Sequence, residues 1–199
     1  MYKFVAERAP RRSIPNSTQE KSSPETVLAF WRAAGPDKWF KKDAAFDDDI
    51  RRRFLETHEA AAARQLADWE ATPDGALALV IVLDQFPRNM FRGSVRAFAA
   101  DPLARAIADR ALARDFDQKV ASAERTFFYL PFEHSEAIAD QERCVALFRA
   151  TGDAEALKWA EQHADVIRRF GRFPHRNAAL GRATTPQERA FLDSGGFAG

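Results

Sequence analysis

The residues best suited to chemistry lie in one segment, Tyr129-Leu-Pro-Phe-Glu-His-Ser-Glu136, which continues to Gln141. We predict a helix over about 134–150, so that His134 and Gln141 share one face and Glu136 and Asp140 lie on an adjoining face. His134 or Glu136 could then act as a general acid or base. A structural interpretation fits equally well: the glutamates complement the positive end of the helix dipole, and His134 is a partly buried histidine.

A short motif occurs twice, once at Phe86–Asn89 and again at Phe173–Asn177. In each copy we expect a helix to end, Phe-Pro to break it, and Arg-Asn to follow. The structural explanation is that proline stops the helix, asparagine tolerates a left-handed backbone, and arginine meets free carbonyls. In the functional alternative, the two turns face each other and present forked donors to an anion. We predict that both turns meet beside the His134 helix in one polar region lined by Arg88, Asn89, Arg176 and Asn177.

Asp84 directly follows the apolar run Ala76–Leu83, whose residues Leu79, Val80, Val82 and Leu83 we place in the core. A carboxylate carried into a core needs a partner. Arg88 could serve if the helix persists past Pro87, and Arg176 is the alternative. The carboxylates of Asp84, Glu133, Glu136 and Asp140 would suffice to neutralise Arg88, Arg172 and Arg176. If every arginine is paired, the cluster is a structural clamp; if one remains free, it binds an anion.

The remaining histidines and the cysteine suggest packing more than catalysis. His163 lies on an apolar stripe of a helix and is expected in the core, His175 belongs to the second turn, and His58 is expected to be exposed on a charged helix. No two histidines have the spacing of a helical zinc site, so we predict neither a metal nor a cofactor. Cys144 resembles a packed small hydrophobe, and motifs for nucleotide binding or a nucleophile elbow are absent.

Helix-start signals recur along the chain. Ser23, Thr72, Asp101 and Thr185 each stand before a proline, and Thr185 completes a capping box with Glu188. No segment alternates as a strand would. We predict an all-α fold of antiparallel helical hairpins, stacked as a compact tetratricopeptide-like bundle or short superhelix. Residues 1–22 are predicted to be a polar tail and 23–199 a single all-α domain, with helices at about 24–33, 43–62, 73–86, 94–99, 102–113, 122–129, 134–150, 154–170 and 186–193.

Composition argues against several classes of partner. The 199 residues are 46% hydrophobic and carry 30 basic against 29 acidic side chains, a net charge of +1, so we predict no nucleic-acid partner. The most apolar run is too short to cross a bilayer and no signal-peptide core is present, so we predict no membrane association. A single cysteine suits a reducing compartment, which favours the cytoplasm.

Three motifs together resemble the bacterial "domain of unknown function 924" family. They are Leu83-Asp-Gln-Phe-Pro-Arg-Asn89, Tyr129-Leu-Pro-Phe-Glu-His-Ser-Glu136, and Phe170-Gly-Arg-Phe-Pro-His-Arg-Asn177 with Leu180-Gly-Arg182. The resemblance runs from about Val27 to Leu192. It implies a fold of the tetratricopeptide-like superhelical class and no established activity.

Two functional hypotheses follow. The first is a binding or scaffold module whose polar pocket or clamp takes an anionic small molecule or peptide; its candidate ligand-binding residues are Asp84, Arg88, Asn89, His163, Arg172, Arg176 and Asn177. The second is a small hydrolase-like enzyme acting on an anionic molecule, with His134 or His175 as general base and Glu136 nearby.

Overall fold

Helices begin at the capping residues that the sequence supplies. In the computed structural model, which describes residues 22–197, the side chains of Ser23, Asp43, Thr72, Asp153 and Thr185 each accept a backbone N–H from a first helical turn. Glu188 completes the predicted capping box. Each cap meets donors that have no partner inside the helix, which fixes where the helix starts.

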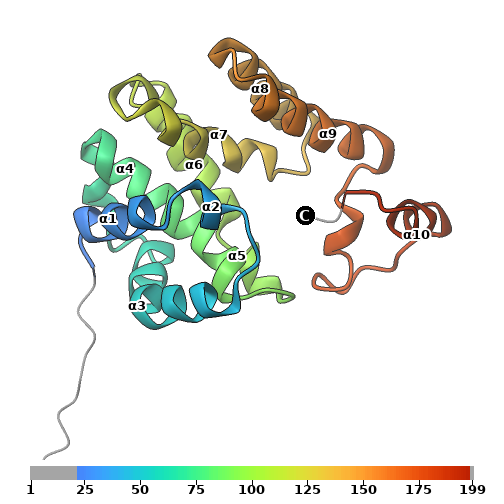
Figure 1. Cartoon of the computed structure of the whole chain (residues 1–199), viewed down its shortest axis with the longest axis horizontal. Helices are drawn as coiled ribbons and strands as arrows, with labels where there is room; N and C mark the ends of the chain where they lie inside the picture. Colours follow the sequence, from blue (N-terminus) through green and yellow to red (C-terminus); the bar gives the residue numbers. More distant parts are fainter. Residues whose placement is uncertain (1–21, 198–199) are drawn as a thin grey trace, which may run out of the picture.

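The described residues form helices and connecting segments without any strand, which confirms the all-α prediction (Figure 1). The α-helices are α1 Pro24–Ala34, α2 Pro36–Trp39, α3 Ala44–Ala62, α4 Pro73–Val80, α5 Phe86–Met90, α6 Asp101–Leu112, α7 Thr126–Glu133, α8 Ile138–Thr151, α9 Ala154–Phe170 and α10 Pro186–Asp193. Short 3-10 turns occupy Ala67–Ala71, Val95–Ala97, Asp117–Lys119, Ser122–Glu124 and Pro174–Arg176. The tail predicted at 1–22 lies, apart from its last residue, outside the described residues.

The first Phe-Pro does not end its helix, contrary to the prediction. A π-helical segment, Ile81–Gln85, joins α4 to α5, and the Phe86 N–H bonds the carbonyl of Ile81 five residues back. In this register the Val82 carbonyl would face the nitrogen of Pro87, which has no hydrogen to donate. His58 Nδ1 donates to that carbonyl instead, over 3.0 Å. His58 is therefore buried, and the prediction of an exposed histidine was wrong.

The helix predicted from His134 starts four residues later, at Ile138. α7 instead continues through Pro131, and His134 is its C-cap. His134 and Gln141 consequently do not share a helical face. Gln141 is buried and its Nε2 donates to the carbonyls of Glu133 and Ser135, both at 2.6 Å, which holds the α7–α8 connection closed.

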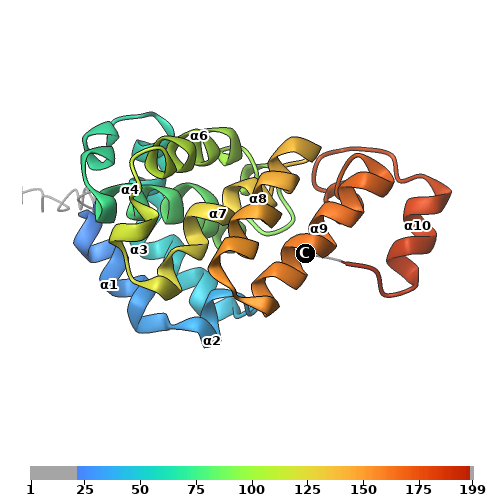
Figure 2. The same ribbon diagram turned by 90° about the horizontal axis from the view of Figure 1, so that it is seen from above.

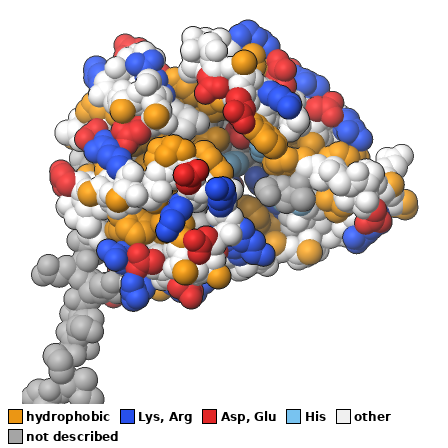
Figure 3. Space-filling model, in the orientation of Figure 1, with side chains coloured by type: hydrophobic (Ala, Val, Ile, Leu, Met, Phe, Trp, Pro, Cys, Tyr) orange, Lys and Arg blue, Asp and Glu red, His pale blue; other side chains and the backbone are white. Residues whose placement is uncertain are grey.

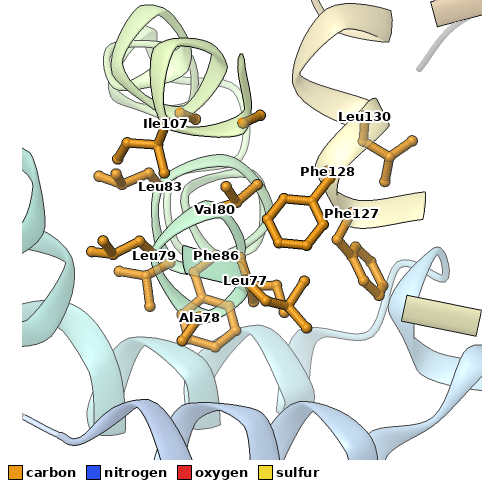
Figure 4. Packing of buried hydrophobic residues seen from close by; sticks show 14 of the residues in the cluster. Leu77, Ala78, Leu79, Val80, Leu83, Phe86, Ile107, Phe127, Phe128 and Leu130 are labelled. Atoms are coloured by element: carbon orange, nitrogen blue, oxygen red, sulfur yellow. The ribbon is translucent and has the colours of Figure 1, made fainter. Parts of the chain in front are cut away.

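The core is centred on α4 and the π-helical segment (Figure 4). α4 packs against α1, α6 and α7, while α3 packs against α5. Leu79, Val80, Val82 and Leu83 are at most 2% exposed, as predicted. Such complete burial follows because this stretch is apolar on every face.

α8 and α9 pack side by side and are joined by only two residues, so they run antiparallel as a hairpin. Figures 1 and 2 place α1 and α10 at opposite ends of the molecule. A second, smaller apolar cluster lies near α10 and contains Val166, Ile167 and Phe173, with Phe170, Phe191 and Phe197 packed against it. Within residues 22–197, every helix is too short or too polar to cross a bilayer.

We expect His58→Ala to lower the free energy of unfolding by about 1–3 kcal/mol, because it leaves the buried Val82 carbonyl without a donor. Urea denaturation monitored by circular dichroism measures this loss. Pro87→Ala restores a backbone N–H beside the same carbonyl, so the cost of His58→Ala should be smaller in the Pro87→Ala background. Equal costs in both backgrounds would show that His58 does not substitute for the missing donor.

Candidate functional site

A buried carboxylate–histidine pair joins the π-helical segment to the end of α7. His134 Nδ1 lies 2.9 and 3.0 Å from the two carboxylate oxygens of Asp84, whose side chain is fully buried. Arg88 Nη1 approaches the same carboxylate at 3.4 Å, and Gln85 Nε2 donates to it over 2.7 Å. The structure thus confirms the predicted need for a partner and assigns it to Arg88 and His134.

Burial and neighbouring charges act on the pKa of both members of this pair. Burial alone would raise the pKa of Asp84, but the opposing charge of Arg88 and the His134 hydrogen bond bring it below its usual value. Burial, reinforced by Arg88, lowers the pKa of His134. At neutral pH the pair is therefore a carboxylate and a neutral imidazole. Since Nδ1 donates its hydrogen to Asp84, Nε2 carries the lone pair of His134, whose side chain retains 14% exposure.

Arg88 links two carboxylates from different elements. Its two terminal nitrogens lie 3.1 and 3.0 Å from the oxygens of Asp101, in the first turn of α6, and Nη1 also contacts Asp84. Sequence patterns suggested only a helix cap for Asp101, whereas its side chain caps nothing and serves as the partner of Arg88. Arg88 thereby ties the π-helical segment to the start of α6.

Two further arginines are also paired. Arg172 binds Glu188 through Nε and Nη2 at 2.6 and 2.9 Å, and Asn177 donates to the same carboxylate over 3.2 Å. Arg182 binds Glu136 at 2.7 and 2.9 Å, and Glu136 also accepts the Phe173 N–H. The candidate catalytic residue Glu136 is therefore occupied in anchoring the second turn.

Arg176 differs from the other three arginines. It is 6% exposed, its guanidinium carbon lies 4.7 and 4.4 Å from the ring centroids of Phe98 and Phe173, and Nη1 donates to the His134 carbonyl over 2.9 Å. Its nearest carboxylate, Asp101, is 3.9 Å away and already holds Arg88. No acceptor among residues 22–197 meets Arg176 Nε. Burial and the charge of Arg88 lower the pKa of Arg176 to about 10, so it remains cationic at neutral pH.

The predicted meeting of the two Phe-Pro turns is half confirmed. Arg88 and Arg176 both approach Asp101 and both stack on Phe98. Asn89 does not join them and donates to Asp47 of α3 over 2.7 Å. The reason is that α5 is helical, so consecutive residues point in directions about 100° apart. Asn177 likewise turns away, towards Glu188.

Glu133, His163 and His175 lie near these residues and carry titratable groups whose pKa values are shifted by burial. His163 Nδ1 lies 3.5 Å from Glu133 and 2.8 Å from the Trp159 carbonyl, and His163 is buried as predicted. Burial and the charge of Asp84 raise the pKa of Glu133 to about 8, while burial lowers the pKa of His163 and of His175 to about 4. All three are uncharged at pH 7. Nδ1 of His175 is buried and meets no partner within the described chain.

Figure 3 shows the surface hollowed between the part that contains α1–α7 and the part that contains α9 and α10, with histidine side chains visible in the hollow. Of the four histidines, His134 and His175 are the two that keep partial exposure. We use "the central cluster" for Asp84, Arg88, Asp101, His134 and Arg176. Nowhere in residues 22–197 do three or more histidine, cysteine or acidic side chains gather as metal ligands would.

Glu133→Gln should change how stability depends on pH. Because the folded-state pKa of Glu133 is raised to about 8, folding retains a proton that the unfolded chain loses above its ordinary pKa of 4.5. The wild type should therefore lose stability relative to the variant as pH rises from 6.5 to 8, by up to about 1.4 kcal/mol per pH unit. Urea denaturation across this range tests it, with Glu142→Gln on exposed α8 surface as the control. Parallel curves for all three proteins would contradict the assignment.

Comparison with known proteins places the chain in a family without assigning an activity. A solved structure of a protein of unknown function, ATU0120 from Agrobacterium tumefaciens, superposes with a TM-score of 0.83 at 50% sequence identity, covering 86% of this chain and 97% of that chain. A search of curated proteins finds no match. The family model described as "Bacterial protein of unknown function (DUF924)" matches residues 27–196, and the chain belongs to that family.

Proposed function

We propose that the protein binds a small anionic molecule at the central cluster, with Arg176 as the anchor. The observation that carries this proposal is the contrast among the arginines. Arg88, Arg172 and Arg182 each hold a carboxylate through two nitrogens, whereas Arg176 holds none that way and its Nε lacks an acceptor among the described residues. Two other arginines have an unmet Nε–H: Arg182, whose guanidinium Glu136 already neutralises, and Arg125, which lies outside the central cluster.

Four side chains of the site and its neighbourhood add no negative charge of their own. Glu133, His134, His163 and His175 are uncharged at neutral pH, so they do not repel an anion. Phe98 and Phe173 hold the guanidinium plane in place, which reduces the entropy lost on binding. The Nε–Nη2 edge that Arg172 uses for Glu188 is the edge that a carboxylate or phosphate would meet on Arg176.

A hydrolase remains the second candidate because Asp84 orients His134. A neutral imidazole that donates from Nδ1 to a buried carboxylate presents Nε2 as a proton acceptor, the arrangement of a general base. Arg176 would then stabilise the negative charge that develops on the substrate. His134 fits this role better than His175, because no carboxylate of the described residues orients His175 Nδ1.

Arg176→Gln should abolish stabilisation by small anions. Thermal unfolding of the wild type should shift upwards with acetate or phosphate, by an amount corresponding to about 2.7 kcal/mol when the anion reaches 100 times its Kd. The variant should not shift. Arg169→Gln, a half-exposed arginine near the end of α9, is the control and should respond as the wild type does. Equal shifts in all three proteins would place the anion elsewhere.

His134→Gln separates binding from catalysis. If the hydrolase candidate is correct, the wild type turns over p-nitrophenyl esters or phosphates, and the variant loses about 100-fold or more of that rate. Anion-induced stabilisation should survive in the variant because Arg176 is intact. If the wild type binds anions but turns over none of these substrates, the hydrolase candidate is wrong and the protein is a binding module.

A further inference from the structure

The aromatic ring of Phe197 lies against three residues of the candidate site. Its centroid is 4.2 Å from that of His163, 5.4 Å from that of His175 and 6.4 Å from that of Phe173. The segment after α10 reaches this position through Gly195, which has a φ of +78°, and Gly196. A Cβ on Gly196 would lie 2.5 Å from the Phe191 carbonyl oxygen, so only glycine permits the turn.

The surface under Phe197 has the character of a binding site for a ring. His163 and His175 are uncharged at neutral pH and Phe173 is fully buried, so the three present aromatic faces and edges without a net charge. The same Phe173 ring stacks on the Arg176 guanidinium at 4.4 Å. An aromatic surface and a guanidinium whose Nε meets no acceptor among residues 22–197 are therefore adjacent.

Phe197 is attached less firmly than the residues it covers. It is only partly buried, it belongs to the periphery of the small apolar cluster, and ring contacts are the interactions shown for it. Segments that follow the last packed helix and have few buried contacts open at low free-energy cost. Another ring could thus replace Phe197 without disturbing the main core.

We propose that His163, Phe173 and His175 form a subsite for the ring of a small aromatic carboxylate, which displaces Phe197 while its carboxylate binds Arg176. This inference rests on the proposed function and specifies its ligand class. A carboxylate suits the site better than a phosphate dianion because Asp101 lies 3.9 Å from Arg176, and a second negative charge would be repelled there. The Phe197 ring shows the size and orientation that the subsite accepts.

Calorimetry with fragments tests the two halves of the site separately. The probes are acetate, phenylacetate, 3-phenylpropionate and benzyl alcohol, titrated into the wild type, Phe197→Ala, Arg176→Gln and the control Phe40→Ala, whose ring is 65% exposed. We expect Phe197→Ala to bind the aromatic carboxylates at least about 10-fold more tightly than the wild type, since the subsite is already vacant. Phe197→Ala should bind acetate with the same affinity as the wild type. Arg176→Gln should no longer bind acetate, phenylacetate or 3-phenylpropionate. Of the four proteins, only the Phe197→Ala variant should bind benzyl alcohol.

Three results would overturn the inference in distinguishable ways. If acetate binding depends on Arg176 but the aromatic carboxylates bind no more tightly than acetate, with or without Phe197, the subsite is wrong and the anion site stands. If Arg176→Gln binds carboxylates as well as the wild type, the proposed function fails and the inference falls with it. Benzyl alcohol bound equally by the wild type and Phe197→Ala would also overturn displacement.

A label at Phe197 follows the displacement without removing the ring. With 4-fluorophenylalanine in place of Phe197, phenylacetate should move the fluorine resonance towards its value in the unfolded chain, whereas acetate should leave it unchanged. A resonance that stays fixed while phenylacetate binds would overturn the displacement of Phe197.

Discussion

The buried carboxylate of Asp84 is the constraint on which the rest of the site depends. It lies within the most apolar helical stretch of the chain, where an isolated charge would be strongly destabilising. Arg88, His134 and Gln85 surround it, and Arg88 extends the contact to Asp101. One buried charge thereby fixes the relative positions of the π-helical segment, the start of α6 and the end of α7. Replacing Asp84 or Arg88 alone would strand a buried charge, so these two residues act as a unit.

Proline explains why Asp84 can occupy that place. Pro87 cannot donate a backbone hydrogen, and the helix accommodates it by widening into a π-helical segment instead of ending. The carbonyl left over is satisfied by His58 from α3. The wide π-helical turn therefore holds Asp84 in the core, and the His58 hydrogen bond joins α3 to the same turn. The backbone irregularity is thus part of the candidate site.

The second Phe-Pro turn contributes in another way. It is a 3-10 turn anchored by Glu136 and Glu188, and it delivers Arg176 between two aromatic rings beside the His134 carbonyl. The sequence presented a clamp and a binding site as alternatives, but the carboxylate pairing of three arginines is compatible with the proposed anion site at the fourth. Arg88, Arg172 and Arg182 hold the structure together, and the proposed anion site depends on Arg176, whose Nε meets no acceptor among residues 22–197. Phe197 covers an aromatic surface beside this site, a contact that sequence patterns gave no reason to expect.

The sequence by itself determined the all-α class, several helix starts, the core helix and the kinds of residue in the site. Capping side chains and N-terminal prolines act within one turn, so helix starts such as Pro73 and Pro186 could be predicted locally, and an apolar run with an aspartate at its end implied a charge partner within reach. Only the tertiary structure decided that His134 ends α7 instead of starting α8, that Asn89 faces Asp47, and that Arg176 rather than Arg88 lacks a carboxylate pair. These outcomes depend on packing angles and side-chain directions between segments some 40 to 90 residues apart, such as Asn89 and Asp47 or His134 and Asp84 or Arg176 and Arg88. Local sequence patterns carry no information about such distances.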